Sequence, residues 1–275
     1  MKITDLKKEI TKSLETELPS LEASMLLEHF LKKDRVYILT HPDEDVPCNI
    51  EEKIRDALKK RNSLVPMAYI TNEREFYGLK FFVNEHVLIP QPDTETLVEE
   101  ALKETKKGSR VLDICTGSGA VGIAIKMNSR AAVCLSDIDE NALLVAKKNY
   151  RDIVKEEPDA RQSDLFASWQ GEEFDIITAN PPYVTLFCYS SVSEEVKHEP
   201  KLALLDYAPD GLDITRRIIK EAKSHLRKNG SLLLESDWRQ CGKIRKILDF
   251  EGYVNIETVK DLAGKERVTK AKYPK

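Results

Sequence analysis

The chain has 275 residues, of which 41% are hydrophobic and 33% charged, and its formal net charge is -4. The length suits two domains of roughly 100–200 residues each, and the acidic balance argues against a protein whose main task is to grip nucleic-acid phosphates. No stretch approaches the ~18 apolar residues of a membrane span, and the charges that follow Met1 argue against a signal peptide. We therefore expect a cytoplasmic protein with no membrane partner.

The cysteine pattern predicts neither a disulfide framework nor a metal site. The number of cysteines is odd, and no two of them have metal-ligand spacing: Cys48, Cys115, Cys134, Cys188 and Cys241. This usage fits a reducing cytosol, and we expect no bound metal.

Residues 1 to about 75 predict a small helical bundle. Apolar residues recur at helical spacing with charges between them, first at Leu6, Ile10 and Leu14 and then from Leu21 to Leu31. A third helix is expected from about Ile50 to Arg61. The segment contains no catalytic constellation. It is therefore either a stabilising appendage or a platform for a macromolecular partner.

Residues 69–89 alternate aromatic and polar side chains around a turn at Gly78, which predicts a β-hairpin that joins two domains. Pro90 and Pro92 follow, and a helix is expected from about Thr94 to Lys106. After this helix, strand and helix patterns alternate. We expect strands at 110–114, 131–136, 174–179 and 230–235, helices around 119–128, 140–150, 211–228 and 239–250, and tail strands at 253–259 and 266–271.

Such alternation predicts an α/β fold with a mostly parallel sheet and helices on both faces. In such sheets, ligands bind at the carboxyl ends of the strands. The informative motifs of this sequence all lie at those positions.

The segment Arg110–Gly119 reads as a strand, a glycine-rich turn and the start of a helix. Gly117 and Gly119 allow a tight turn and a close approach of the backbone to a ligand. The spacing lacks the full dinucleotide fingerprint, and Asp113 ends the strand just before the turn. A carboxylate there would repel a pyrophosphate, but it suits the ammonium group or the water shell of a methionine moiety.

Acidic residues also follow the next two strands. Asp137 stands about 20 residues beyond the turn, where a ribose-binding carboxylate belongs. The alternative is that Asp137 or Asp139 only caps the following helix; we favour ribose for Asp137 and the cap for Asp139. Further along, Asp164 can accept from an adenine amino group and Leu165 can pack on the base.

Asn180-Pro181-Pro182-Tyr183, at the end of an apolar strand, is the strongest signal in the sequence. The two prolines fix the backbone and have no N–H to compete for its carbonyls. The Asn180 side-chain oxygen and a fixed proline carbonyl can accept both hydrogens of an NH2 group, while the Tyr183 ring lies against the flat group and excludes water. The alternative is a stiff loop that merely ends a strand.

This arrangement suits a difficult nucleophile. The lone pair of an amide or aromatic amine nitrogen is delocalised, so the nitrogen attacks poorly. Two acceptors on its hydrogens raise its electron density, and a rigid loop aims it at a sulfonium methyl group. Positioning and electrostatic preorganisation supply most of the rate in such a site, with no metal and no Ser-His-Asp set.

The Asn-Pro-Pro-Tyr motif resembles that of amino methyltransferases, which act on planar NH2 groups. Five further stretches resemble the peptide release factor glutamine methyltransferases (the HemK or PrmC family): Phe76-Tyr-Gly78, Val87–Glu95, Glu199–Leu204, Asp210-Gly-Leu212 and Asp261–Val268. The resemblance covers nearly the whole chain. It implies a helical domain at 1–75 that contacts the release factor, a hairpin linker at 76–93 and a Rossmann-like class I methyltransferase domain at 94–275.

The same resemblance implies a reaction and a set of site residues. The cofactor is S-adenosylmethionine, and the substrate is the glutamine of the Gly-Gly-Gln motif in class I release factors, methylated on N5. The substrate-binding residues are Asn180, Pro181, Pro182 and Tyr183: Asn180 and the Pro181 backbone hold the substrate amide, in a pocket lined by Tyr183. The cofactor is bound by Asp113, Cys115, Thr116, Gly117, Ser118, Gly119, Asp137, Asp164, Leu165 and Asn180.

The sequence departs from the family pattern at three places. Cys115 stands where the family usually has glycine, Gln91 replaces a usual arginine, and the residues after Glu235 differ from the usual Glu-x-Gly pattern. These departures bear on affinity more than on the type of reaction.

Three other functions are compatible with parts of the sequence. A ribosomal-protein glutamine methyltransferase shares the Asn-Pro-Pro-Tyr motif. A DNA adenine-N6 methyltransferase uses nearly the same chemistry, but it flips the base out of the duplex, and the chain has no basic insert for that task. A nucleotide-binding or scaffolding protein with an inactive site is disfavoured by the intact Asp113, Asp137 and Asn180. We therefore expect nucleic acid not to be a partner.

Overall fold

The computed structural model describes residues 1–275 and divides into two compact units. The first unit comprises Met1–Asn72 and Ser193–His198, and the second comprises Glu73–Val192 and Glu199–Lys275. The division gives the hairpin that follows Asn72 to the second unit. The roles assigned to segments 1–75 and 76–93 stay predictions.

The first unit is a helical bundle, as expected. Its helices are α1 (Ile3–Ser13), α2 (Pro19–Leu31), α3 (Arg35–Thr40), α4 (Cys48–Asn62), α5 (Met67–Thr71) and the short η3 (Val196–His198). Leu6, Ile10, Leu26, Leu27 and Ile54 form its buried centre. No helix in the whole chain has the length and apolar character needed to cross a membrane.

A buried arginine connects separate stretches of this unit. Arg61 is 7% exposed, and its guanidinium donates to both carboxylate oxygens of Glu22, at 2.8 and 2.9 Å. It also donates to Glu195 at 3.4 Å, and His198 Nε2 lies 3.0 Å from the Ser63 carbonyl oxygen. These contacts explain why Ser193–His198 belongs to the bundle despite its distance along the sequence.

The predicted hairpin is present but shorter than expected. Strands β1 (Glu73–Phe76) and β2 (Leu79–Phe82) pair antiparallel around Gly78, whose φ is +71°. Residues 69–71 belong instead to α5, because this stretch closes the helical unit. The aromatic alternation therefore predicted the turn correctly and the length of the strands wrongly.

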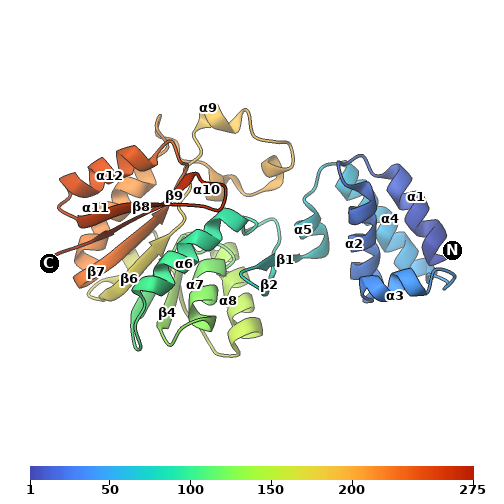
Figure 1. Ribbon diagram of the computed structural model, residues 1–275, viewed down its shortest axis with the longest axis horizontal. Helices are drawn as coiled ribbons and strands as arrows, with labels where there is room; N and C mark the ends of the chain where they lie inside the picture. Colours follow the sequence, from blue (N-terminus) through green and yellow to red (C-terminus); the bar gives the residue numbers. More distant parts are fainter. The chain divides into compact units, whose positions relative to one another are not determined.

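The second unit is built on a seven-stranded sheet with the order β5-β4-β3-β6-β7-β9-β8 (Figure 1). The first five strands in this order run parallel, and β9 is antiparallel to both β7 and β8. The strands are β3 (Arg110–Ile114), β4 (Ala132–Asp137), β5 (Asp159–Gln162), β6 (Phe174–Ala179), β7 (Leu226–Glu235), β8 (Val254–Lys260) and β9 (Glu266–Lys272).

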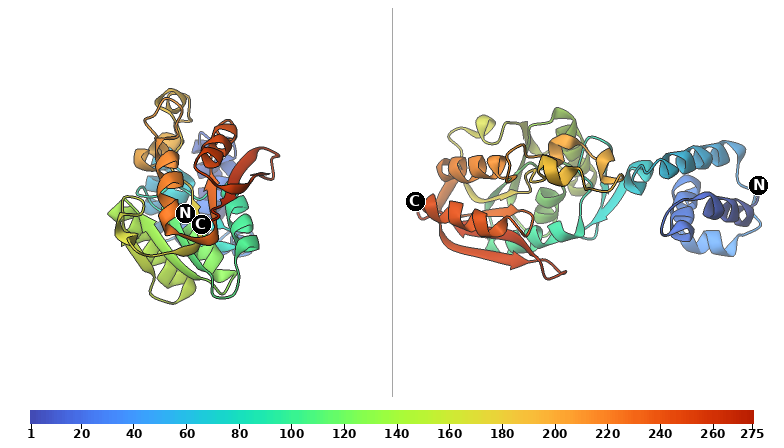
Figure 2. Two further views of the ribbon diagram at one scale, coloured as in Figure 1. Left: turned by 90° about the vertical axis from the view of Figure 1, so that its left-hand side faces the viewer. Right: turned by 90° about the horizontal axis from the view of Figure 1, so that it is seen from above.

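Helices cover both faces of this sheet. α6 (Glu95–Glu104), α7 (Ala120–Met127) and α8 (Glu140–Val154) lie on one face, and α11 (Asp213–His225) and α12 (Cys241–Phe250) lie on the other (Figure 1). Short helices α9 (Leu186–Tyr189), α10 (Lys201–Leu204), η1 (Pro92–Thr94) and η2 (Ala167–Trp169) lie in the connections. Both views in Figure 2 show the red β8–β9 hairpin projecting from the edge of the sheet. The predicted Rossmann-like fold is confirmed.

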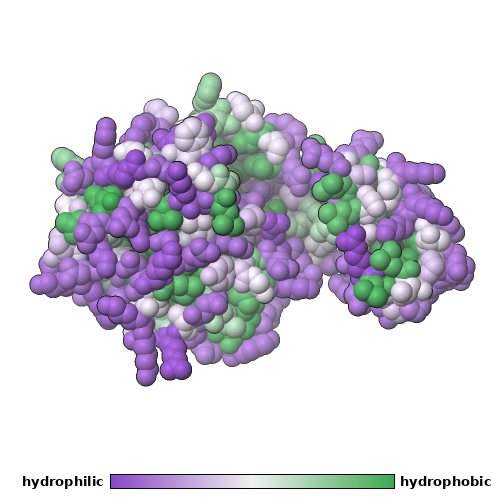
Figure 3. Space-filling view, viewed as in Figure 1, coloured by the Kyte–Doolittle hydropathy of each residue, from purple (hydrophilic) through white to green (hydrophobic).

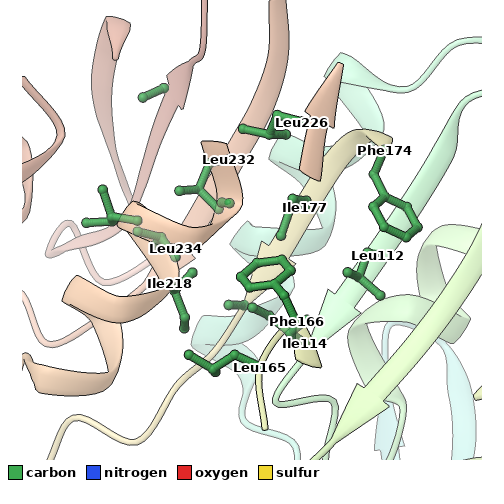
Figure 4. Close-up of a cluster of buried hydrophobic side chains, with 14 of the residues drawn as sticks. Leu112, Ile114, Leu165, Phe166, Phe174, Ile177, Ile218, Leu226, Leu232 and Leu234 are labelled. Atoms are coloured by element: carbon green, nitrogen blue, oxygen red, sulfur yellow. The ribbon is translucent and has the colours of Figure 1, made fainter. Parts of the chain in front are cut away.

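An apolar core fixes the strand ends in place. Leu112 of β3, Ile177 of β6 and Leu232 of β7 belong to one buried cluster with Ile218 of α11 (Figure 4). Phe166, from the loop after β5, lies beside Ile177 in the same view. Charged residues are confined largely to the outside, and hydrophilic side chains dominate the face drawn in Figure 3. Burying apolar surface in this way is the main source of stability, so the strand ends form a rigid platform.

Several elements were not predicted, among them β5 and α3, and some boundaries were wrong. β5 has the sequence Asp-Ala-Arg-Gln and lies at the sheet edge, so it lacks the apolar run by which a buried strand is recognised. α3 is only six residues long. The helix expected at 211–228 spans 213–225, because Gly211 has a φ of +67° before it and residues 226–228 already belong to β7.

Candidate active site

The glycine-rich turn connects β3 to α7 through left-handed backbone. Cys115, Gly117 and Gly119 have φ values of +54°, +53° and +82°. Glycine is favoured at position 119 mainly by its left-handed backbone, and a Cβ there would also lie 2.9 Å from Ile123 Cδ1. Cys115 holds the left-handed conformation at a cost of roughly 1–2 kcal/mol relative to glycine, and the turn is therefore formed despite this departure from the family pattern.

Asp113 stabilises this turn through hydrogen bonds. The residue is 2% exposed, and its Oδ2 accepts from Thr116 Oγ1 at 2.6 Å and from the Gly122 amide at 3.1 Å. Its Oδ1 accepts from Thr178 Oγ1 at 2.8 Å. Burial raises the pKa of Asp113 to about 6. Both oxygens are engaged inside the protein, so the Asp113 carboxylate holds the turn in shape.

Asp137 ends β4 beside the same turn. Its Oδ2 accepts from the Gly117 amide at 2.8 Å and its Oδ1 accepts from the Asp139 amide at 3.0 Å. Burial raises its pKa. Asp139 accepts from the Asn141 amide at 2.9 Å and is the N-cap of α8, as expected. The two acidic residues therefore have separate tasks, and Asp137 is the one that faces the turn.

The third acidic position lies in the loop after β5. Leu165 is 7% exposed and has a left-handed φ of +49°. Asp164 Oδ1 accepts from the Arg217 guanidinium at 3.0 Å. This ion pair leaves Asp164 Oδ2 for a ligand, and it places a cation at the cavity that the sequence had not indicated.

The Asn-Pro-Pro-Tyr loop starts directly after β6. Gln240 Nε2 donates to the Tyr183 carbonyl oxygen at 3.1 Å, and Val184 pairs with Leu205 in a parallel bridge. Burial raises the pKa of the Tyr183 phenol, so it stays neutral. The prolines stiffen the loop from within, and these contacts fix it from outside.

One cavity in the second unit brings the two sets of residues together. Among the predicted site residues it is lined by Asp113, Cys115, Thr116, Gly117, Ser118, Asp137, Asp164, Leu165, Asn180 and Pro182. Gly119, Pro181 and Tyr183 do not line it. Asn180 and Pro182 thus bring the Asn-Pro-Pro-Tyr loop into the same cavity as the glycine-rich turn.

Comparisons with known proteins identify the family of the chain. The protein-family model described as "PrmC N-terminal domain" matches residues 5–71, and the family model described as "Methyltransferase small domain" matches residues 91–195. A release factor glutamine methyltransferase of Neisseria gonorrhoeae is 38% identical over 267 residues, covering 94% of this chain and 96% of the relative. One from Shewanella oneidensis is 36% identical and covers 94% and 91%.

The chain belongs to the release factor glutamine methyltransferase family. It is an S-adenosylmethionine-dependent methyltransferase, so the predicted family, enzyme class and cofactor are confirmed.

Solved structures support the fold alone. A methyltransferase from Pyrococcus furiosus is similar with a TM-score of 0.55 and 17% identity, over 82% of this chain and 98% of that chain. A 16S rRNA methyltransferase of T. thermophilus is similar with a TM-score of 0.54 and 20% identity, over 73% and 49%. Both are too distant in sequence to say anything about the substrate.

The residues of the cavity fit S-adenosylmethionine. Gly117 has open space where a Cβ would stand, so a ligand can approach its backbone closely. The negative charge of Asp113 suits a cationic ammonium, and the Asp137 carboxylate suits ribose hydroxyls. Leu165 and Ile214 supply apolar surface for a flat ring. The cavity thus combines the charge and the apolar lining that this cofactor requires.

Several lining residues were missed by sequence reasoning. They come from the segment after the hairpin, from the α10 region and from α11: His86, Val87, Leu88, Pro90, Thr94, Pro200, Leu202, Ala203, Ile214 and Arg217. Most lie within stretches that resemble the family, and that resemblance was the available signal. Gln91, a departure from the family, also lines the cavity, and its side chain donates to the Ile89 carbonyl at 3.1 Å.

Gly211 gives a direct test of how the Asn-Pro-Pro-Tyr loop is supported. A Cβ there would lie 2.4 Å from the Tyr183 carbonyl oxygen and 2.7 Å from Gln240 Nε2, at a φ of +67°. We expect Gly211→Ala to lower the free energy of unfolding by about 1–3 kcal/mol and to reduce methyl transfer, because the loop must shift. Thermal unfolding and single-turnover rates measure the two effects.

Gly252→Ala is the matched control for this substitution. Gly252 also has a left-handed φ, +84°, but a Cβ there would meet nothing within 4 Å. It should show the conformational strain without the loss of activity. Equal activity in the two variants would contradict a supporting role for Gly211.

Proposed function

We propose that this protein transfers a methyl group from S-adenosylmethionine to the side-chain amide nitrogen, N5, of the glutamine in the Gly-Gly-Gln motif of class I release factors. The observation that carries the proposal is the shared cavity, in which Asn180 and Pro182 stand beside Asp137 and the glycine-rich turn. The names and near full-length similarity of the relatives support the choice of substrate.

The chain's own residues would act by holding and orienting the substrate amide. The cofactor, when bound, supplies a methyl group on a positively charged sulfur. Asn180 Oδ1 would accept one amide hydrogen, which raises the electron density on the nitrogen. The family resemblance gives the other hydrogen to the Pro181 carbonyl, although Pro181 does not itself line the cavity. The Tyr183 ring would cover the flat amide and exclude water. Positioning and preorganised dipoles would account for most of the rate enhancement.

The first unit would supply recognition of the protein substrate. Residues 5–71 match the N-terminal domain model of the family, and the unit carries no cluster of residues suited to chemistry of its own. Exposed apolar side chains, among them Val36 (67% exposed) and Leu39 (61% exposed), suit contact with another protein. Because release factors act in translation termination, the enzyme would work in the cytoplasm.

Intact-protein and peptide mass spectrometry test this function. The purified enzyme is mixed with S-adenosylmethionine and a bacterial class I release factor, and in a second reaction the Gly-Gly-Gln glutamine is changed to alanine. We expect a gain of one methyl group on that glutamine and none on the changed substrate. Transfer to a ribosomal protein or to duplex DNA, with none to the release factor, would overturn the proposal.

A further inference from the structure

Glu235 ends β7 next to the start of the Asn-Pro-Pro-Tyr loop. Strands β6 and β7 run parallel with Ala179 opposite Leu234, so the next residues along the two strands are Asn180 and Glu235. Adjacent residues at the carboxyl ends of neighbouring parallel strands lie side by side. The sheet register therefore places a carboxylate directly beside the amide of Asn180.

The Glu235 carboxylate is buried and incompletely bonded. The residue is 3% exposed; its Oε1 accepts from Thr94 Oγ1 at 3.1 Å, while Oε2 is buried with no partner of good hydrogen-bonding geometry. Burial raises the pKa of the Glu235 carboxyl, and the Asn180 side-chain amide lies close enough to lower it in part. An unsatisfied buried oxygen beside an amide donor is an acceptor held ready for that donor.

The nearby arginine is engaged elsewhere. Arg267 donates to Asp93 at 2.8 Å and to Asp261 at 3.1 Å, and it forms no ion pair with Glu235. A buried carboxylate that only stabilises the fold is normally paired with a cationic side chain, since a buried unpaired charge is costly. Glu235 is left with the Thr94 hydroxyl as its hydrogen-bond donor, and Arg267 favours its charged form only through space.

The chemical difference between the two ends of an asparagine amide makes this neighbour important. A carboxylate only accepts hydrogen bonds, so it attracts the Nδ2 hydrogens of Asn180 and turns Oδ1 the other way. If the amide were reversed, Nδ2 would point its hydrogens at the hydrogens of an incoming NH2 group. Correct orientation of Asn180 thus needs an acceptor behind it.

We propose that Glu235 is a positioning residue that fixes the Asn180 side-chain amide with its oxygen toward the substrate NH2 group. This inference rests on the proposed function of Asn180. Glu235 would orient the Asn180 side chain, which accepts from the substrate, and would not itself contact the reacting atoms.

Glu235→Gln is the main test, because glutamine has the same shape but offers both a donor and an acceptor. Asn180 can then take either orientation. We expect kcat for release factor methylation to fall roughly 10- to 100-fold, with the KM for the release factor, the Kd for S-adenosylmethionine and the Tm close to wild type. A fall in Tm and cofactor affinity in step with kcat would show a merely structural role and would overturn the proposal.

The pH profile of kcat provides a readout that a structural role would not move. Burial raises the pKa of Glu235 to about 7. The carboxylate is the working form, so kcat of the wild type should fall as the pH is lowered through about 7, and Glu235→Gln should lack this step. The other titratable or charged groups near Glu235 come from η1, the loop after β6, the loop after β7 and β9: Asp93, Tyr183, Asp237 and Arg267. Persistence of the step in the variant would count against Glu235.

Two further variants complete the experiment. Glu100→Gln changes another buried glutamate, 3% exposed and bonded to Lys103 and Lys270; it should leave kcat and the pH step unchanged. In an Asn180→Ala background, Glu235→Gln should have no further effect on kcat, because its partner is gone. An additive loss there would refute action through Asn180. If the wild-type enzyme does not methylate the release factor, the proposed function is wrong. If the wild type is active but Glu235→Gln is equally active, only the role of Glu235 is wrong.

Discussion

Asn180→Ala is expected to lower kcat by roughly 10²- to 10³-fold, the usual cost of removing one preorganised group that stabilises the transition state. Asn180 lines the cavity together with the glycine-rich turn, and its side-chain oxygen is proposed to hold one hydrogen of the substrate amide. Because that contact matters for the nucleophile, the Kd for S-adenosylmethionine should stay within about twofold of wild type. Single-turnover kinetics and calorimetry separate the two quantities.

Asn128→Ala is a suitable control for this substitution. Asn128 follows α7, its side chain donates to the Ala124 carbonyl at 2.9 Å, and it does not line the cavity. The control should retain wild-type kcat. Parallel loss of cofactor binding and turnover in Asn180→Ala would mean that Asn180 serves mainly the cofactor.

The opposite pattern is expected for Asp137→Ala. Its carboxylate supports the Gly117 amide at 2.8 Å and is proposed to accept from the ribose hydroxyls. Hydrogen bonds to a charged acceptor contribute about 1.5–3 kcal/mol, so the Kd for S-adenosylmethionine should rise roughly 10- to 100-fold. Once the cofactor is saturating, kcat should recover most of the wild-type value. Titration calorimetry and initial rates at increasing cofactor concentration measure both.

Asp152→Ala serves as the control for Asp137→Ala. Asp152 is an exposed carboxylate of α8 that pairs with Lys148, away from the cavity. Cofactor affinity should be unchanged in this variant. If Asp137→Ala has a wild-type Kd for S-adenosylmethionine, Asp137 does not bind the cofactor and only supports the turn.

The strand and helix pattern of the second unit was predictable because apolar runs report burial directly. β3 and β6 are almost wholly buried, and their ends match the expected positions. β5 was not predictable in this way, since an edge strand with polar residues has no such run. Local composition therefore predicts the centre of a sheet better than its margin.

The site was predictable to the extent that it consists of contiguous motifs. The turn after β3 and the loop after β6 are each readable along the chain, and the parallel sheet brings them together. Arg217 and Ile214 reach the cavity only through tertiary packing, so no local pattern indicated them. The internal bonds of Asp113 were equally invisible, because sequence spacing does not say whether a carboxylate faces a ligand or the protein.

The segment Ser193–His198 has a consequence for the synthesis of the chain. The backbone passes from one unit to the other after Asn72, after Val192 and after His198. A ribosome that has made only the first 72 residues has not yet produced Glu195, which contacts the buried Arg61. The N-terminal bundle therefore receives its last piece only after most of the catalytic unit has emerged, and a fragment cut at Asn72 would lack it. During synthesis, the first unit can therefore be completed only after most of the second unit has been made.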